Sequence, residues 1–376
     1  MRILITKPEP PGKQGGMTFA LEQLISCLHK NDKLQISFLE YAESNEYRIH
    51  TVRIHSTTNS FSTIQEAIKF NNPELVIGVG WHTWNEQVTR IAKRNQCKTI
   101  FWSHGVGAFT WYTSKPLLSV ARMCLRAHQI ISLFKTLLQT DQLVTAYKRE
   151  RWQDTRSIDE VIARWLNVGN TVIPNAIDSS LWSPLSEFST PRPWVLSIGR
   201  LEWQKGMKKA FEIVRNSNNS NSKEYELKWL VMDPGGTTIN NETKAIRSLN
   251  AKHNGGNQLI ERTGLKAAER RDILNQALCL LCWSDTEYQS LAILEALSCG
   301  CPVVSRPVGW LKHQSVPGVM LANNQAQASA CVIRLASDQC LHNQMAAAAR
   351  KGIIEKHQME IVAKQWEAVI EKIAYE

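Results

Sequence analysis

The chain has 376 residues, a formal net charge of +10 and 13 tryptophans. A hydrophobic fraction of 43% and a charged fraction of 21% are ordinary for a folded protein, so the composition excludes a disordered tail, a collagen-like chain and a small stapled scaffold. The length favours two domains. The positive charge predicts an acidic partner: a nucleic acid, an anionic membrane or a phosphorylated small molecule.

We expect neither a signal peptide nor a membrane span. The apolar run in the opening MRILIT is too short for a signal-peptide core, and no run of about 18 apolar residues follows. An odd number of cysteines, nine, predicts reduced thiols in a cytoplasmic protein. The close pairs Cys279/Cys282 and Cys299/Cys301 lie in apolar text, so we favour core packing over metal or redox chemistry.

Short apolar runs alternate with helical stretches. In the first half we expect strands at Arg2–Thr6, Leu75–Val79 and Thr99–Trp102, and helices at Thr18–His29 and Glu86–Asn95. A proline- and serine-rich boundary follows at Trp182–Trp194. The pattern then restarts, with strands expected at Val195–Ile198, Lys228–Met232, Leu278–Cys282 and Pro302–Ser305, and a last helix at Glu360–Ala374. This alternation predicts an α/β fold of two domains with parallel sheets.

Ligands of such sheets bind at the carboxyl ends of the strands, so the loops there are the candidates for chemistry. Gly15 and Gly16 precede a helix, where backbone amides could approach an anion; the alternative is a plain tight turn. His104 follows a strand and is either a cleft residue or an ordinary polar one. Neither a P-loop nor a complete dinucleotide fingerprint is present.

The string GRLEWQKG brings Arg200 and Lys205 into one loop. Two cations so close together repel unless an anion or solvent separates them. A diphosphate would suit the planar fork of Arg200 and the point charge of Lys205, whereas the alternative is a solvated surface pair.

The segment 284–304 is the most informative, because a helix is expected to begin near Ser290, with Glu287 in the loop before it and Glu295 in its second turn. The helix start offers amides and a partial positive charge between the two carboxylates. A nucleotide-sugar has the matching layout, with a diol at each end and a diphosphate between them. Asp285 and Glu287 also form a D-x-E string, which we discount as a metal motif because Arg200 and Lys205 could neutralise the diphosphate.

Together these motifs resemble glycosyltransferase family 4, whose members are retaining enzymes of the GT-B fold. Besides the glycine loop, His104 and GRLEWQKG, the resemblance rests on VIPNAID at Val172–Asp178 and on the E-x7-E spacing of Glu287 and Glu295 with the following run to Val304. It implies two Rossmann-like parallel α/β domains facing across a cleft, at residues 1–183 and 190–357. A C-terminal helix at 358–376 would pack back toward the first domain.

The resemblance also implies the roles of individual residues. Arg200 and Lys205 would hold the donor diphosphate, Glu287 the transferred sugar and Glu295 the ribose, and His104 would contact the donor sugar near the reacting carbon. The remaining donor-binding positions are Gly15, Gly16, Ser290 and Leu291. No metal or other cofactor is expected, and the donor would be linked to UDP or GDP.

The expected function is the retaining transfer of a hexose-type sugar to a glycan, a lipid-linked or another hydroxyl acceptor, in bacterial surface-glycan synthesis. Tyr288-Gln289-Ser290 replaces the Gly-Phe-Gly usual in the family, and Trp310 replaces a glycine. These departures leave a degenerate sugar- or nucleotide-binding protein with little turnover as the alternative.

The acceptor should enter through the first domain, where Trp81 and Trp111 lie near strand ends and could stack on sugar rings, although core packing is the more common role of a tryptophan. Lys115–Leu138, with Arg122 and Arg126, reads either as a basic amphipathic helix on an anionic membrane or as a buried helix. Nucleic-acid binding is disfavoured, because no recognised motif is present and the basic residues are spread along the chain. We therefore expect a cytoplasmic protein that can attach peripherally to the membrane.

Overall fold

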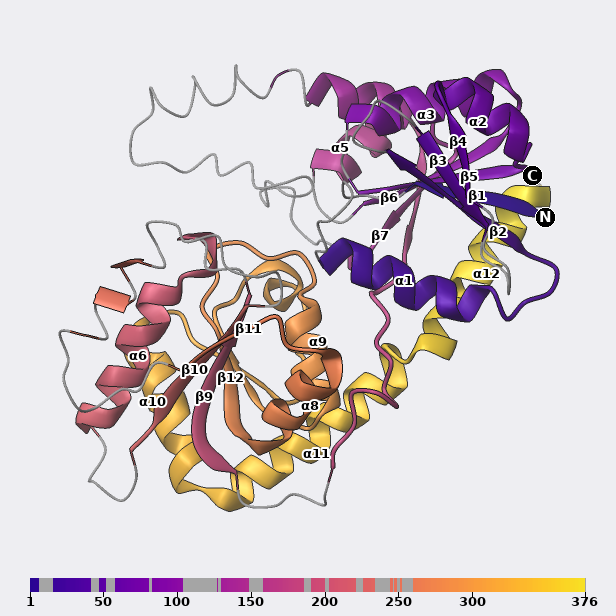
Figure 1. Ribbon diagram of the computed structural model, residues 1–376. Helices are drawn as coiled ribbons and strands as arrows, with labels where there is room; N and C mark the ends of the chain where they lie inside the picture. The colour runs from indigo at the N-terminus through magenta and orange to yellow at the C-terminus, as the bar shows by residue number, and fades with distance from the viewer. Residues whose placement is uncertain are drawn as a thin grey trace. The chain divides into compact units, whose positions relative to one another are not determined.

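The computed structural model describes residues 1–6, 16–41, 47–51, 58–80, 83–103, 127, 130–148, 158–185, 191–199, 203–220, 226–233, 244–245, 247–248, 251 and 260–375. The chain divides into an N-terminal domain, Met1–Ala176 with Glu360–Glu376, and a C-terminal domain, Ile177–Met359 (Figure 1). The last segment of the chain therefore belongs to the first domain, and residues 177–181, which precede the proline- and serine-rich boundary, belong to the second.

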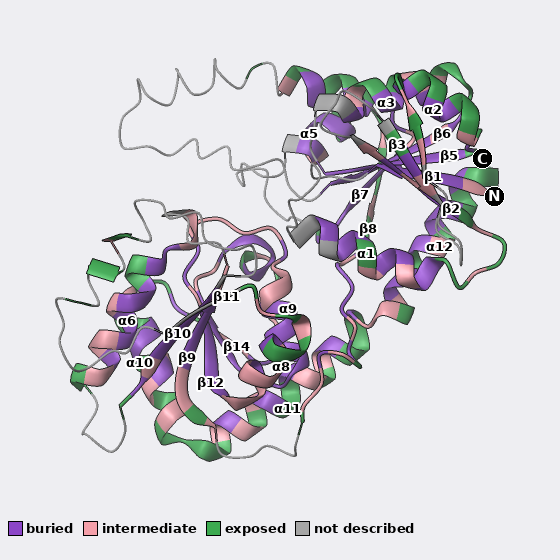
Figure 2. Cartoon of the chain, in the orientation of Figure 1, coloured by how far each residue is buried: buried purple, intermediate pink, exposed green. Residues whose placement is uncertain are grey.

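The N-terminal domain is built on an eight-stranded sheet in the order β4-β3-β2-β1-β5-β6-β7-β8. Its strands are β1 (Arg2–Thr6), β2 (Gln35–Tyr41), β3 (Tyr47–Thr51), β4 (Thr58–Phe61), β5 (Leu75–Val79), β6 (Lys98–Ser103), β7 (Gln142–Thr145) and β8 (Gly169–Val172). All neighbours pair in parallel except β2-β3 and β3-β4, which form an antiparallel edge. The strands β1, β5 and β6 are almost entirely buried (Figure 2), as expected for a parallel sheet covered on both faces.

Helices cover this sheet on both sides, with α2 and α3 on one face and α1 and α12 on the other (Figure 1). Their bounds are α1 (Gly16–Leu28), α2 (Ile64–Asn71), α3 (Thr83–Arg94), α5 (Ile158–Trp165) and α12 (Met359–Tyr375). A capping box between Thr63 and Glu66 starts α2. The last helix is fixed to the domain by Trp366, whose ring meets Trp102 of β6 edge-on at 4.9 Å.

The C-terminal domain has a six-stranded, entirely parallel sheet in the order β11-β10-β9-β12-β13-β14. Its strands are β9 (Arg192–Ile198), β10 (Lys228–Asp233), β11 (Ile260–Thr263), β12 (Ala277–Cys282), β13 (Val303–Ser305) and β14 (Val319–Leu321). Two short 3-10 helices, η2 (Trp203–Lys205) and η3 (Gly309–Lys312), lie in its loops.

The helices of this domain are α6 (Met207–Ser220), α8 (Ala267–Gln276), α9 (Leu291–Ser298), α10 (Gln325–Ser337) and α11 (Gln339–Lys356). In Figure 1, α6 and α10 lie on one face of the sheet and α8, α9 and α11 on the other. The core under α6 and α10 includes Phe211 and Trp229, whose rings meet edge-on at 5.7 Å.

The α/β fold class with parallel sheets is confirmed, and the strands and helices expected from the apolar runs form within a few residues of their predicted ends. The sequence analysis named no strand at β2, β3, β4, β7, β8, β11 or β14. Of these, β3 and β4 have the polar sequences YRIHT and TNSF, which lack an apolar run. Among the described helices, none combines the length and the apolar character needed to cross a membrane.

Candidate functional site

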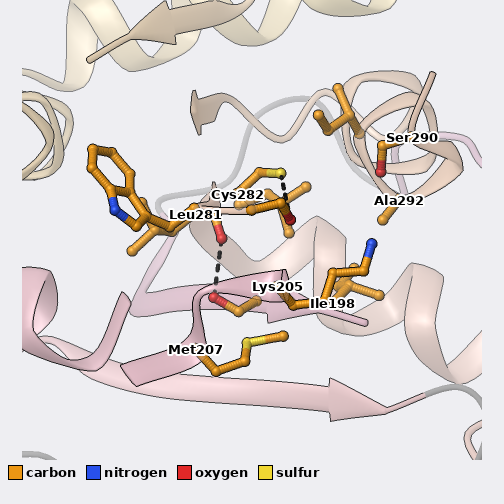
Figure 3. Close-up of a pocket in the computed structure, with 12 residues that line it drawn as sticks. Ile198, Lys205, Met207, Leu281, Cys282, Ser290 and Ala292 are labelled. Carbon is orange, nitrogen blue, oxygen red and sulfur yellow. Dashed lines mark hydrogen bonds between the residues drawn. The ribbon is translucent and has the colours of Figure 1, made fainter. Parts of the chain in front are cut away.

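The strand order of the C-terminal sheet marks where a site can form. The chain runs outward from β9 through β10 to β11, and outward in the opposite direction from β12 through β13 to β14. The loops that follow β9 and β12 therefore diverge at one point on the carboxyl edge of the sheet, which is where ligands of such sheets bind. A pocket lies there, between the ends of both strands and the start of α9 (Figure 3). It is lined by Ser197, Ile198, Lys205, Met207, Leu280, Leu281, Cys282, Trp283, Ser284, Ser290, Ala292 and Ile293.

The loop after β9 docks closely on the loop after β12. Gly206 has a φ of +63°, and a Cβ atom there would lie 2.2 Å from the carbonyl oxygen of Trp283. In the same loop, the carbonyl of Gln204 accepts a hydrogen bond of 2.8 Å from the amide of Asp285. Only a glycine at position 206 permits this approach, which fixes the backbone of Lys205 beside the strand end.

This docking brings together two residues that the sequence separates by 82 positions. The Lys205 Nζ donates to Glu287 Oε1 at 2.7 Å, with the side chains only 24% and 10% exposed. Because both groups are largely removed from water, each limits the desolvation cost of the other. The pair places a carboxylate beside the Lys205 ammonium, whose residue lines the pocket.

A third loop, after β13, holds the backbone of Glu287 in place. Gly309 has a φ of +56°, and a Cβ atom there would lie 2.6 Å from the carbonyl oxygen of Glu287 and 2.3 Å from that of Tyr288. The amide of Trp310 donates to the same Tyr288 carbonyl at 3.0 Å. The position of Glu287 thus depends on contacts with loops from both neighbouring strands.

Asp285 is bound by two cations. Arg306 Nη1 donates to its carboxylate in a short contact, and Lys209 Nζ lies 3.5 Å from the same Oδ1 atom. The guanidinium of Arg306 also lies 5.7 Å from the centroid of the Trp283 ring. In the D-x-E string, Asp285 therefore pairs with Arg306 and Lys209, while Glu287 pairs with Lys205.

Glu295 lies in the second turn of α9, as expected, and is buried. Burial raises the pKa of its carboxyl to about 7, against the opposing effect of the Arg270 guanidinium, whose Nη2 is 3.3 Å from Oε1. Ser290 is the N-cap residue of α9 and Leu291 its first residue, but the Ser290 side chain makes no capping hydrogen bond.

The structure thus brings Lys205 and Ser290 to one pocket, pairs Glu287 with Lys205, and pairs Glu295 with Arg270. Gly16 is the first residue of α1. The other predicted site residues lie outside the described residues: Gly15, Trp81, His104, Trp111 and Arg200. Trp102, another tryptophan near a strand end, is buried in the core of its domain.

Three of the four clustered cysteines pack in the core of this domain, whereas the half-buried Cys282 lines the pocket. Cys279, Cys299 and Cys301 are buried free thiols, and burial raises the pKa of each. Thiols that stay protonated are weak nucleophiles and weak metal ligands. Their environment supports the packing role that their apolar surroundings indicated.

Sequence reasoning missed Arg270 and Arg306. Arg270 stands in the charged string AERRD, which is typical of a solvated helix face, yet it is only 6% exposed. Arg306 follows a strand, and its position on the carboxyl edge of the sheet was the one available signal.

Comparisons with known proteins found one matching family model and many similar solved structures. Residues 181–352 match the family model described as glycosyl transferases group 1. No curated protein sequence matches the chain significantly. Among solved structures, sucrose-phosphate synthase from Thermosynechococcus elongatus superposes with a TM-score of 0.72 at 14% identity, covering 99% of this chain and 98% of that one.

Two further structures carry bound nucleotides. HepE from Anabaena in complex with UDP-glucose has a TM-score of 0.71 at 11% identity, over 99% of this chain and all of its own. The catalytic domain of starch synthase IV from Arabidopsis thaliana, bound to ADP and acarbose, has a TM-score of 0.69 at 12% identity, over 100% and 99% of the two chains. The fold is therefore GT-B, the two-domain α/β fold of these glycosyltransferases, with the matched family segment containing Lys205, Glu287 and Glu295.

Proposed function

We propose that the protein is a retaining glycosyltransferase that moves a hexose-type sugar from a nucleoside diphosphate to a hydroxyl acceptor. The observation that carries this proposal is the Lys205–Glu287 pair at the carboxyl edge of β9 and β12, within the segment that matches the glycosyl transferase model. A diphosphate can draw the Lys205 ammonium toward itself, and the Glu287 carboxylate then accepts hydrogen bonds from sugar hydroxyls. Lys205 would stabilise the charge that develops on the leaving diphosphate.

The remaining donor contacts follow the same layout. The α9 N-terminus at Ser290 and Leu291 would face the diphosphate, and Glu295 would accept from the ribose hydroxyls. The Asp285 carboxylate is already neutralised by Arg306 and Lys209, which supports a reaction without a metal. UDP or GDP remains the proposed carrier, and the UDP-glucose bound to HepE supports the uridine nucleotide. Arg200, His104, Gly15 and Gly16 keep the donor-side roles predicted for them.

The decisive test is a panel of UDP-, GDP- and ADP-sugars in thermal-shift and donor-hydrolysis assays. We expect one donor to stabilise the protein and to be hydrolysed slowly, and Lys205→Ala and Glu287→Ala to abolish turnover without loss of folding. Lys351→Ala is the matched control, because Lys351 is 78% exposed on α11. Normal turnover by either site variant would refute the assignment.

A binding protein with little turnover is the second candidate. Gln289, in the tripeptide that replaces Gly-Phe-Gly, is buried, so the segment after Glu287 carries side chains where bare backbone was expected. Tight binding of a nucleotide-sugar with neither hydrolysis nor transfer to any acceptor would favour this candidate.

We further propose that the acceptor is lipid-linked and that the N-terminal domain touches the cytoplasmic membrane face, in bacterial surface-glycan synthesis. Within the helical residues 130–138, Leu133 and Leu137 are buried, whereas Ile131, Phe134 and Leu138 are 52%, 38% and 51% exposed. Spacings of three and four residues place these three side chains along one face. An apolar stripe on a chain of net charge +10 suits an anionic bilayer.

Vesicle co-sedimentation tests the membrane contact. Binding to anionic vesicles should weaken with salt and with Phe134→Ser, and should persist with Phe70→Ser, since Phe70 is another exposed aromatic, at the end of α2. Equal binding by all three proteins would refute the contact.

A further inference from the structure

The carboxylate of Glu295 is held in a setting that disfavours its charge. The residue is 8% exposed, and burial raises its pKa to about 7. The charged group that faces it is Arg270 from α8, while Cys299 at the end of its own helix is a protonated thiol. Arg271 from α8 and Arg350 from α11 act on Cys299. Arg270 is therefore the contact that favours the ionised form of Glu295.

Arg270 is itself held from three sides. Its Nη1 donates to the carbonyl of Leu265 at 3.2 Å, its Nη2 donates to Glu295, and its guanidinium carbon lies 5.2 Å from the centroid of the Trp182 ring. A planar guanidinium can stack and donate at once, which a lysine cannot do. The Trp182 ring therefore helps to set the orientation of the Arg270 guanidinium.

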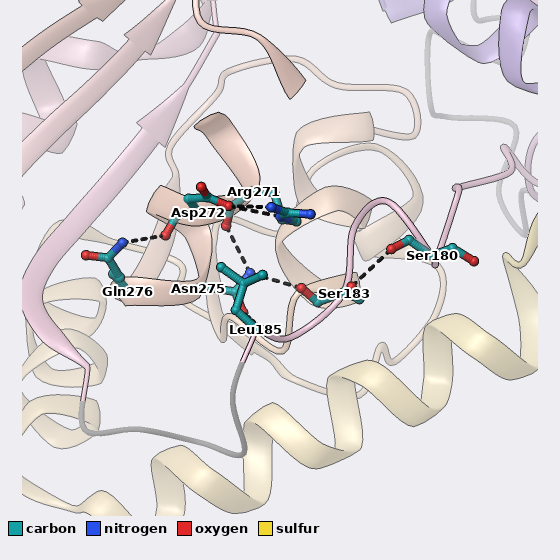
Figure 4. Close-up of polar contacts among 7 residues, drawn as sticks. All are labelled: Ser180, Ser183, Leu185, Arg271, Asp272, Asn275 and Gln276. Carbon is teal, nitrogen blue, oxygen red and sulfur yellow. Dashed lines mark hydrogen bonds and ion pairs between the residues drawn. The ribbon is translucent and has the colours of Figure 1, made fainter. Parts of the chain in front are cut away.

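The segment that carries Trp182 is held by hydrogen bonds to α8, α9 and α11. The carbonyl of Trp182 accepts from Ser298 Oγ at 2.6 Å and from Arg350 Nη1 at 2.8 Å. On α8, the Asn275 amide donates to the carbonyl of Ser183 at 3.0 Å (Figure 4). Three helices therefore fix the segment that carries Trp182, and through it Arg270.

We propose that Arg270, clamped by Trp182, is a positioning residue that keeps Glu295 ionised and oriented to accept hydrogen bonds from the ribose hydroxyls of the donor nucleotide. The inference rests on the proposed function, in which Glu295 meets the ribose. A carboxylate accepts from a diol, whereas a carboxylic acid offers a weaker and differently placed acceptor. Discrimination between ribo- and 2′-deoxyribonucleotides should therefore depend on Arg270 and on pH.

The experiment measures dissociation constants calorimetrically for UDP and 2′-deoxy-UDP at pH 6.0, 7.0 and 8.5, with the GDP or ADP pair instead if that nucleotide binds better. The wild-type preference for the ribonucleotide should reach about tenfold at pH 8.5 and shrink at pH 6.0. Taking the ratio of the two nucleotides cancels the titration of their shared phosphates.

Arg270→Gln should lose the preference at pH 7.0 and regain part of it at pH 8.5, while Glu295→Gln should show none at any pH. Arg271→Gln, the same change one residue along α8, should behave as wild type. If Arg270→Gln does not fold, Arg270→Lys is the deciding variant. Its positive charge should keep the pH at which the ribonucleotide preference is half-lost near the wild-type value, while the loss of stacking on Trp182 should reduce the size of that preference.

The outcomes distinguish a failure of the positioning role of Arg270 from a failure of the ribose contact of Glu295. If Glu295→Gln loses the preference while Arg270→Gln or Arg270→Lys matches wild type at every pH, Arg270 is only structural and this inference is overturned. If Glu295→Gln keeps the wild-type preference, the ribose assignment itself fails, and this inference fails with it.

Discussion

Gly309→Ala offers a direct test of how the loops of the site are assembled. The residue has a φ of +56°, which costs an alanine about 1–2 kcal/mol. Its Cβ atom would also lie 2.3 Å from the Tyr288 carbonyl oxygen and 2.6 Å from that of Glu287. Both neighbours are backbone atoms, so the loop after β12 must move, which adds roughly 1–3 kcal/mol.

Gly264→Ala is the matched control, because Gly264 lies in the same domain, has a φ of +65° and has nothing within 4 Å of the point that a Cβ atom would occupy. It should cost only the backbone part, about 1–2 kcal/mol. Replacing a glycine lowers the conformational entropy of the unfolded chain equally in both variants. The difference between their free energies of unfolding therefore isolates the contact with Glu287 and Tyr288.

Urea unfolding followed by circular dichroism measures both variants in the transition of the C-terminal domain. We expect Gly309→Ala to be about 1–3 kcal/mol less stable than Gly264→Ala and to bind the nucleotide-sugar more weakly, because Glu287 is displaced. Equal destabilisation of the two variants, with unchanged binding by Gly309→Ala, would refute this account of the loop.

Three further predictions concern charged groups of the C-terminal domain. The pKa of Glu295 is raised from 4.5 to about 7, so the folded state keeps a proton that the unfolded state loses as the pH rises between these values. Glu295→Gln should therefore gain stability relative to wild type between pH 5 and pH 8, by at most about 3 kcal/mol, and a constant difference in urea unfolding across this range would contradict the prediction. Arg350 donates to several carbonyls, so Arg350→Ala should cost about 2–4 kcal/mol in urea unfolding, whereas Lys351→Ala should change stability by less than about 0.5 kcal/mol. Lys205→Met leaves the largely buried Glu287 carboxylate without its cation, so adding Glu287→Gln should restore part of the lost stability in a double-mutant cycle; additive losses would show that the pair is not coupled.

The central strands β5 and β12 were predictable because each is a continuous apolar run. The strands LVIGV and ALCLLC are buried along almost their whole length. A short apolar run of this kind, in a sequence that alternates with helical stretches, is typical of a buried parallel strand. The edge strand β4 escaped prediction because TNSF pairs on one side only and has little apolar surface to bury. A strand with little apolar surface to bury is therefore hard to recognise from local sequence.

Sequence alone determined that this chain has two parallel α/β domains, and it singled out Lys205, Glu287 and Glu295, since periodicity and loop position are local properties of the chain. Only the tertiary structure decided the partners of these residues. The Lys205–Glu287 contact requires two strands distant in sequence to be neighbours, and a glycine that lets their loops touch. The Arg270–Glu295 contact requires Arg270, from the charged string AERRD of α8, to be buried against the Trp182 ring. That burial follows from packing among segments distant in sequence and not from the residue types next to Arg270.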